Sequence, residues 1–134
     1  MIRQAKSMLK DYPNVCLYKT NGKDLSLFPE GKFDFVFSLF VFQHLEKEDT
    51  YLYLTEIFRV LKGGGSSYLQ FPNFLADWHF ENFQKVAKEF GSNGAAKMRY
   101  YTLPEVRKML ECAGFNIEKL TENESIIAIV SKKA

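Results

Sequence analysis

The sequence predicts an α/β fold built around a mainly parallel sheet. Short apolar runs of strand length alternate with amphipathic stretches of helical spacing, and glycine and proline turns separate them. The 134 residues fit one domain, 1–134, which can bury a core of ordinary size. The predicted order is helix, strand, strand, helix, strand, helix, helix, strand, strand. Because ligands bind beyond the carboxyl ends of the strands in such sheets, the residues that follow each strand are the functional candidates.

The first predicted elements are a helix, a short strand and two turns. Residues 1–11 carry apolar side chains at helical spacing, and Pro13 ends this helix because proline cannot continue the hydrogen-bonded ladder. Residues 15–19, VCLYK, form a β-prone run. The pair Asn21-Gly22 then supplies a tight turn, and residues 28–32 form a second turn with proline and glycine.

The run FDFVFSLFVFQHL, residues 33–45, is predicted to begin as a buried strand. Its first six residues are apolar on both faces apart from Asp34, which is typical of a strand covered by helices on both sides. The residues after Ser38 form a turn, and Gln43 and His44 open the next helix at the carboxyl edge of the sheet. The polar end of this apolar run therefore indicates a ligand crevice.

A helix and a strand follow in the middle of the chain. Residues 49–61 carry one apolar stripe, and the stretch Lys62-Gly63-Gly64-Gly65 ends the helix. Residues 46–49 are interpreted as a solvated helix start, whose acidic groups suit the helix dipole. Residues 67–71 form a strand that Pro72-Asn73 halts.

Two helices and two strands complete the chain. The spacing predicts a helix over residues 76–90, which the glycines of residues 91–94 break. Thr102 and Glu105 form a capping box that starts a helix ending near residue 113. Residues 116–120 and 125–131 are then predicted to be strands.

Composition excludes several classes of partner. The chain has 18 basic and 16 acidic residues, and the net charge of +2 predicts neither nucleic-acid nor membrane binding. With no signal peptide and no apolar run of about 18 residues, we expect a cytoplasmic protein. Cys16 and Cys112 are expected to be buried free thiols. The spacing of His44, His79 and the cysteines supports no metal site, and no catalytic nucleophile set is present.

Four segments occur in an order that suggests a family: YKTNGKDLSLFPEGKFDFVFSLFVFQHL, LTEIFRVLKGGG, YLQFPN and YYTLPEVRKMLECAGF, followed by two closing strands. Together they resemble the central and C-terminal part of a class I S-adenosylmethionine-dependent methyltransferase, of the group called methyltransferase type 11. The resemblance covers nearly the whole chain. It implies a Rossmann-like sheet with antiparallel C-terminal strands and S-adenosylmethionine as cofactor.

The resemblance also implies that the sheet is incomplete at its N-terminal side. The family's Gly-rich cofactor loop after the first strand has no counterpart here, nor has the acidic residue after the second strand. We therefore expect the first strands to be missing. The exposed edge of residues 33–38 should then either self-associate or pair with residues 15–19.

The resemblance implies six cofactor-binding residues. Asn21 and Gly22 would contact the adenine, although most relatives carry Asp at the first position and Asn lacks its charge. Ser38, Leu39 and Phe40 would pass the methionine part of the cofactor, and His44 stands where many relatives have a histidine. A plain Asn-Gly turn, and a His44 that only bonds nearby backbone, are the structural alternatives.

Three polar residues are predicted to contact a small-molecule methyl acceptor: Asn73, His79 and Tyr100. They accompany aromatic side chains of residues 78–83, where relatives place the lid that selects the acceptor. The alternative is that these aromatics simply pack in the core or lid. The family's Lys-Pro-Gly-Gly turn is Lys62-Gly63-Gly64-Gly65 here, which alters stiffness more than shape.

Two functions of different classes are therefore predicted. The first is an S-adenosylmethionine-dependent methyltransferase that transfers methyl groups by proximity and is weakly active or inactive as this chain alone. The second is a non-catalytic methyltransferase-like module that binds a partner protein or forms a homodimer through its exposed sheet edge. An NAD-binding Rossmann domain fits the segments less well.

Overall fold

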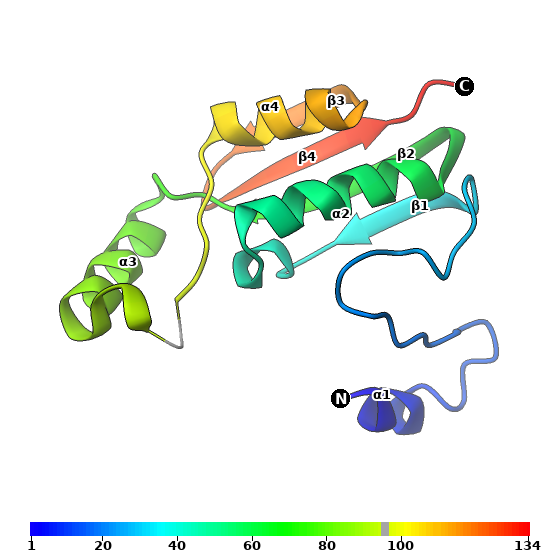
Figure 1. Cartoon of the computed structure of the whole chain (residues 1–134), viewed down its shortest axis with the longest axis horizontal. Coiled ribbons are helices and arrows are strands. Elements are labelled where there is room, and N and C mark those ends of the chain that lie inside the picture. The colour runs from blue at the N-terminus through cyan, green and yellow to red at the C-terminus, as the bar shows by residue number, and fades with distance from the viewer. Residues whose placement is uncertain (95–96) are drawn as a thin grey trace.

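The computed structural model describes residues 1–94 and 97–134 and contains a four-stranded sheet with helices on one face (Figure 1). The strands lie in the order β1-β2-β4-β3. They are β1 Phe33–Ser38, β2 Leu61–Pro72, β3 Asn116–Glu122 and β4 Ser125–Ser131. The helices are α1 Ile2–Met8, α2 Lys47–Val60, α3 Asp77–Phe90 and α4 Leu103–Ala113, with short 3-10 turns at Phe42–His44 and Gly91–Asn93.

The sheet combines one parallel pair with an antiparallel hairpin. β1 and β2 run parallel, joined by α2, whereas β4 is antiparallel to both β2 and β3. The antiparallel C-terminal strands and the Rossmann-like α/β sheet are confirmed. The broader expectation of a mainly parallel sheet is wrong for the described strands, because the short connection between β3 and β4 forces a hairpin and β4 then inserts beside β2.

The glycine stretch after α2 forms a bulge within β2 rather than a turn before it. Phe33 pairs with Leu61 and Phe35 with Ser66, so residues 62–65 loop out of the register. A Cβ on Gly65 would lie 2.9 Å from the Lys62 carbonyl oxygen and 3.0 Å from that of Asp34, and only glycine fits there. The bulge also receives the end of the chain, since the Gly64 amide donates to the Lys132 carbonyl at 2.8 Å.

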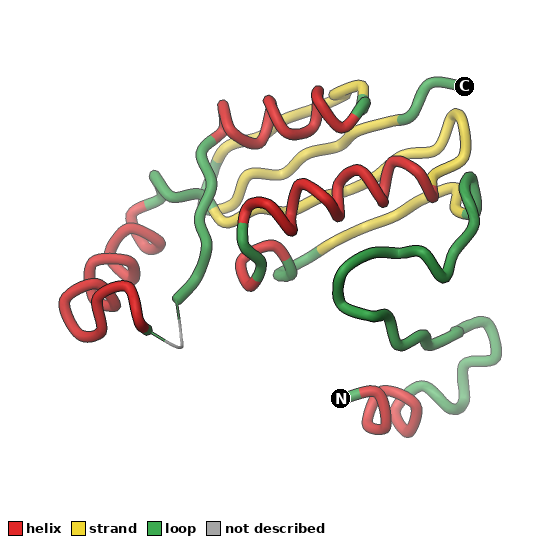
Figure 2. Tube along the Cα trace, viewed as in Figure 1, coloured by secondary structure: helices red, strands yellow, loops and turns green. Residues whose placement is uncertain are grey.

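The predicted strand at residues 15–19 does not form. No helix or strand is described between residues 9 and 32, and the expected pairing of residues 15–19 with β1 is wrong. Tyr18 instead packs its ring edge-on against Phe28 at 5.1 Å between centroids, and Phe28 packs on Phe33 at 5.0 Å. α1 has no buried residue and lies beyond the β1 edge (Figure 2). Among the described residues the run therefore has a side-chain contact but no partner strand, and a β-prone run without a partner does not become a strand.

Both cysteines are exposed, which corrects the expectation that they are buried. Cys16 lies in the irregular N-terminal segment, away from any core. Cys112 lies on α4 two residues after the buried Leu110, which turns it to the opposite side of the helix. None of the helices in residues 1–94 and 97–134 has the length and apolar character needed to span a membrane.

The core lies between the sheet and the helices α2 and α4, which cover the same face (Figure 1). Leu54 and Ile57 of α2 and Val106 and Leu110 of α4 are buried against it. The sheet contributes alternate residues to this core: Leu69 and Phe71 of β2, and Ile126, Ala128 and Val130 of β4.

The opposite face of the sheet is largely open. Phe37, Tyr68 and Ile129 stand in one row across three strands, because Phe37 pairs with Tyr68 and Tyr68 with Ile129. Phe37 is 65% exposed and the neighbouring Phe35 is 53% exposed, although β1 reads as a strand that is buried on both faces. The sequence of β1 is thus more apolar than its surroundings in this chain require.

Two leucines on α2 test this one-sided core. Leu54→Ala removes a fully buried side chain and should lower the free energy of unfolding by about 2–5 kcal/mol, since the cavity cannot fully collapse. Leu52→Ala, on the same helix but 53% exposed, should change it by less than about 0.5 kcal/mol. Urea denaturation followed by circular dichroism measures both. Equal effects would contradict the assigned orientation of α2.

Candidate functional site

The turn after β1 brings exposed apolar side chains to the carboxyl end of the sheet. Ser38 is buried at the end of the strand, whereas Leu39, Phe40 and Val41 are 43%, 66% and 46% exposed. Phe40 has a φ of +58°, in the left-handed region that a residue with a bulky side chain rarely adopts. A strained turn with three exposed apolar side chains is a feature that recurs at ligand sites.

Gln70 holds this turn in place. Its Oε1 accepts a hydrogen bond of 2.8 Å from the Phe40 amide, and its Nε2 donates one of 2.8 Å to Ser125 Oγ. The Gln70 side chain is 5% exposed, so both bonds are shielded from water. The central strand β2 therefore ties the turn after β1 to the first residue of β4.

The 3-10 turn that follows is anchored by aromatic packing. Phe42 stacks on Phe71 with 4.8 Å between ring centroids, and the Tyr101 hydroxyl donates to the Phe42 carbonyl at 3.3 Å. Tyr101 also exchanges a 2.7 Å hydrogen bond with Thr50. Burial raises the pKa of Tyr101, so the phenol is kept as a neutral hydrogen-bonding group.

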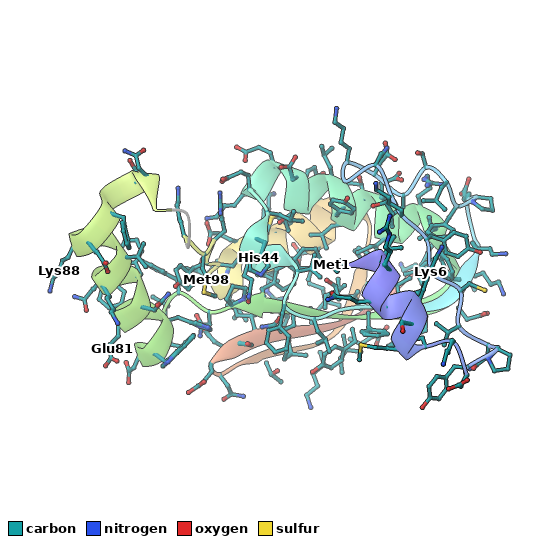
Figure 3. The ribbon with its side chains drawn as sticks, turned by 90° about the horizontal axis from the view of Figure 1, so that it is seen from below. Met1, Lys6, His44, Glu81, Lys88 and Met98 are labelled. Atoms are coloured by element: carbon teal, nitrogen blue, oxygen red, sulfur yellow. The ribbon has the colours of Figure 1, made fainter. Side chains whose placement is uncertain are left out.

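His44 ends this turn on the surface (Figure 3). The side chain is exposed, and its Nε2 lies 3.2 Å from Nε2 of Gln43. Its backbone amide donates to the Val41 carbonyl at 3.0 Å, a bond that belongs to the 3-10 turn itself. The prediction that Gln43 and His44 open the next helix is wrong, because both lie in this turn and α2 begins at Lys47. The structure thus places Ser38, Leu39, Phe40 and His44 on one continuous segment at the carboxyl end of β1.

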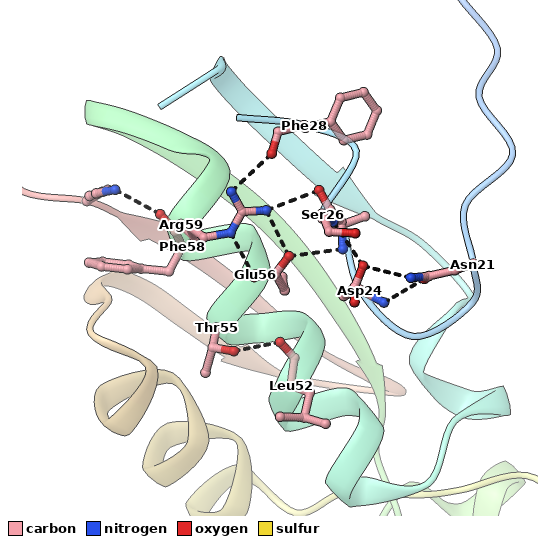
Figure 4. Close-up of polar contacts among 11 residues, drawn as sticks. Asn21, Asp24, Ser26, Phe28, Leu52, Thr55, Glu56, Phe58 and Arg59 are labelled. Carbon is pink, nitrogen blue, oxygen red and sulfur yellow. Dashed lines mark hydrogen bonds and ion pairs between the residues drawn. The ribbon is translucent and has the colours of Figure 1, made fainter. Parts of the chain in front are cut away.

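Asn21 and Gly22 lie in a separate loop that closes on itself (Figure 4). Asn21 Oδ1 accepts bonds from the amides of Lys23 and Asp24 at 2.8 and 3.0 Å, and Nδ2 donates to Asp24 Oδ1 at 2.9 Å. Hydrogen bonds from Ser26 and Asn21 lower the pKa of Asp24, which keeps this acceptor charged. The Asn21 side chain therefore serves its own turn, as the plain-turn alternative predicted.

Glu56 and Arg59 of α2 hold the rest of this loop (Figure 4). Glu56 Oε2 accepts from the Leu25 amide at 3.0 Å, and Arg59 donates to the carbonyls of Leu25 and Phe28 at 3.1 and 3.0 Å. The two side chains also form an ion pair at 2.8 Å, and the bond from Arg59 lowers the pKa of Glu56. Sequence reasoning missed this pair, because the partners in the loop are about thirty positions away in the chain.

The three predicted acceptor residues lie at the carboxyl end of β2 and on the elements beyond it. Asn73 is buried, and its side chain bonds the Asn123 carbonyl at 2.7 Å and the Leu75 amide at 3.0 Å. His79 Nδ1 donates to the Asn73 carbonyl at 3.0 Å, and its ring lies 5.5 Å from that of Tyr100. The structure brings Asn73, His79 and Tyr100 together.

A cleft of about 940 Å³ lies between the N-terminal end of α2, α3 and the segment before α4. Among the lining residues that the structure describes, Tyr100 is the one that was predicted as a site residue. Sequence reasoning did not find this cleft, since its walls come from segments far apart in the chain. The other lining residues are Glu46, Lys47, Glu48, Phe74, Phe83, Val86, Ala87, Gly91, Ser92, Lys97, Met98, Arg99, Thr102 and Glu105.

Two ion pairs join α2 to the opposite wall of the cleft. Arg99 binds Glu46, with Nε 3.0 Å from Oε1, and Lys47 binds Glu105. Burial alone would raise the pKa of Glu105, but hydrogen bonds from Lys47 and Thr102 together outweigh it and lower the pKa. Residues 46–49 are all exposed, which agrees with the interpretation of a solvated helix start, and Glu46 and Lys47 form these ion pairs in addition. Glu105 also accepts from the Thr102 amide at 2.7 Å, which confirms the capping box.

Comparison with known families now identifies the chain. A family model described as a methyltransferase domain matches residues 1–69, which is more than half of the 134 residues. The chain belongs to the methyltransferase domain family. No curated protein sequence matches this methyltransferase-domain chain.

Solved structures share the fold at low sequence identity. A Pyrococcus horikoshii protein superposes on 98% of this methyltransferase-domain chain with a TM-score of 0.73 and 18% identity, and 66% of that protein is covered. A SAM-dependent methyltransferase from Methanosarcina mazei gives 98% coverage, a TM-score of 0.71 and 20% identity, with 77% of its own chain covered. One from Thermotoga maritima superposes on 97% of this chain with a TM-score of 0.72 and 17% identity, and 70% of that protein is covered. The chain thus spans about two thirds to three quarters of the length of these three structures, and only 40% of some others.

The role of Gln70 can be tested by replacing Gln70 with leucine and, as a control, making the same replacement at Gln43. Gln70→Leu removes the acceptor of the Phe40 amide, and should lower the free energy of unfolding by about 1–3 kcal/mol and speed hydrogen exchange at Phe40. Gln43→Leu, which loses only an exposed contact with His44, should change stability by less than about 0.5 kcal/mol. Amide exchange and urea denaturation report both. Unchanged exchange at Phe40 in Gln70→Leu would refute the anchoring role.

Proposed function

We propose that this chain takes part in methyl transfer from S-adenosylmethionine to a small-molecule acceptor, by alignment of the reactants rather than by a dedicated catalytic residue. The observation that supports this most is the exposed apolar turn of residues 39–41 at the carboxyl end of β1, in a methyltransferase-domain sheet. Ligands of open α/β sheets bind at such strand ends. We propose that the protein acts in the cytoplasm.

The residues of the turn after β1 fit the cofactor. Leu39 and Phe40 offer apolar surface to the methionine part, Ser38 ends the strand beside them, and His44 follows at the same edge. Gly22 fits the adenine contact, because its amide makes only a long 3.4 Å bond to Thr20 Oγ1 and the space beside its α-carbon is open. The Asn21 side chain fits less well, since its oxygen already accepts two amides, so Asn21 acts in the proposal by shaping the turn.

The chemistry asks little of the protein beyond position. S-adenosylmethionine supplies a methyl group that its sulfonium has already activated. The chain's residues would hold donor and acceptor in line and exclude water, which is sufficient for large rate effects when the geometry is maintained. Tyr100 would contact the acceptor, and His79, held by its bond to the Asn73 carbonyl, would fix the position of the Tyr100 ring.

Cofactor binding by this chain should be weak, because residues 1–134 hold no Gly-rich loop after a strand that precedes β1. In calorimetry with S-adenosylmethionine we expect a dissociation constant above about 0.1 mM, which corresponds to less than about 5.5 kcal/mol of binding free energy. NMR titration should shift the amides of Gly22, Leu39 and Phe40.

Matched variants separate this site from other apolar surface. Leu39→Asp should abolish the shifts, whereas Leu75→Asp, at a residue that is also exposed, should leave them unchanged. Binding tighter than about 0.1 mM would contradict the argument from the Gly-rich loop. A titration that moves none of the three amides would contradict the cofactor assignment.

A second candidate function is supported by the β1 edge. β1 ends the sheet, and Phe35 and Phe37 beside that edge are exposed with their rings 6.4 Å apart. Such an edge can add a strand from another chain. The chain would then be a non-catalytic module that binds a partner protein or a second copy. A Haloferax volcanii methyltransferase of similar fold, with a TM-score of 0.70, was solved in complex with the activator Trm112.

Sedimentation tests the homodimer. The mass should rise with protein concentration from 15.6 kDa toward twice that value, because β1 pairs with its copy. Phe37→Lys should keep the chain monomeric, while Phe90→Lys, at a 52% exposed position on α3, should not. A wild-type chain that stays monomeric at every concentration would eliminate the homodimer.

A further inference from the structure

The cleft beside α3 has the size and lining of a small-molecule site. Its volume of about 940 Å³ lies at the upper end of the range of about 300–1,000 Å³ that is usual for such sites. The apolar part of its wall comes from α3 and the segments on either side of it. These residues are Phe74, Phe83, Val86, Ala87, Met98 and Tyr100.

The charged part of the lining is balanced. Among the described residues, three acidic and three basic side chains border the cleft, and four of these six are joined in the pairs Glu46–Arg99 and Lys47–Glu105. Glu48 and Lys97 add one charge of each sign. An ionic ligand would lose its hydration without gaining a net opposite charge, so the lining disfavours both anions and cations relative to a neutral molecule.

Tyr100 supplies one polar group in this apolar wall. Its hydroxyl oxygen accepts a 2.8 Å bond from Asn82 Nδ2, and within residues 1–94 and 97–134 no acceptor receives the hydroxyl proton. A phenol in this situation can donate to a ligand. The Tyr100 ring is fixed from several sides by Phe74, His79 and Phe83, at 5.8, 5.5 and 6.4 Å between centroids.

The cleft is joined directly to the segment proposed to bind the cofactor. Glu46 follows His44 by two positions, and the Arg99 amide donates to the Gln43 carbonyl at 2.9 Å. The wall that carries Tyr100 is thus bonded to the 3-10 turn after β1. A ligand in the cleft would lie next to this turn, where a methyl acceptor is needed.

We infer that the cleft binds the methyl acceptor as an uncharged, largely apolar molecule with a flat ring system and an oxygen that accepts the Tyr100 proton. The role of this ligand as methyl acceptor rests on the proposed methyl transfer, whereas the class of ligand follows from the lining alone. Flat rings suit the edges and faces of Phe74, Phe83 and Tyr100, which lie at tilted and edge-on angles to one another.

A matched set of naphthalenes tests the ligand class. The probes are 2-acetylnaphthalene, which is neutral with a carbonyl oxygen, naphthalene, the anion 2-naphthoate and the cation 2-naphthylmethylammonium. We expect 2-acetylnaphthalene to bind at least about tenfold more tightly than either ion, and about fivefold more tightly than naphthalene through the Tyr100 bond. NMR titration of the whole chain should shift the amides of Phe83, Met98 and Tyr100.

Three variants locate the binding. Tyr100→Phe should remove the fivefold advantage of 2-acetylnaphthalene over naphthalene without changing the affinity for naphthalene. Phe83→Ala should weaken all four probes about tenfold, because it removes part of the apolar wall. Phe90→Ala, at an exposed aromatic on the same helix that does not line the cleft, should change none of them.

The outcomes distinguish this inference from the proposed function. Equal affinity for the neutral probe and the ions, or shifts confined to Phe35 and Phe37 on the open sheet face, would overturn the inference, whatever the result with S-adenosylmethionine. Selective binding of the neutral probe in the cleft would support the ligand class even if calorimetry with S-adenosylmethionine failed, and that failure would count against methyl transfer alone.

Discussion

The packing of α2 against the sheet is the constraint on which the rest of the structure depends. Leu54 and Ile57 bury one face of the helix in the core between the sheet and the helices α2 and α4. The other faces hold the two regions proposed to bind ligands. Glu56 and Arg59 bind the loop that carries Asn21 and Gly22, while the first turn of the helix carries the ion pairs of the cleft. One helix therefore sets the relative position of both regions, and a shift of α2 would move them together.

The sequence predicted those helices and strands whose signal lies within their own residues. The apolar run of β1, the apolar stripe of α2 and the capping box of α4 each carry their own signal, and the structure contains all three. The strand expected at residues 15–19 depends on a partner edge, and no local signal reports whether that partner is present. The sequence did not predict the cleft for the same reason. Its ion pairs join residues 53 and 58 positions apart, and only the fold brings them into contact.

Membership of the methyltransferase domain family leaves the chemistry of individual residues open. Asn21 occupies the position expected to contact adenine, yet its oxygen holds two amides of its own turn. The Asn73 side chain likewise bonds to backbone groups, the carbonyl of Asn123 and the amide of Leu75. Both residues fix loops, Asn21 in the irregular segment before β1 and Asn73 directly after β2, and loops fixed in this way can present backbone groups such as the Gly22 amide. A position in a family pattern thus predicts where a contact lies better than which atom makes it.

The strained turn at Phe40 shows how the open side of the sheet depends on the closed side. A left-handed residue of this size costs of the order of 1 kcal/mol or more and persists only where its surroundings impose it. The restraint comes from Gln70 on β2, which is itself bonded to Ser125 at the start of β4. β1 has no strand on its other side to restrain the turn in the described residues. The conformation of the proposed cofactor turn is therefore set from the C-terminal hairpin, the part of the chain that the apolar core stabilises most directly.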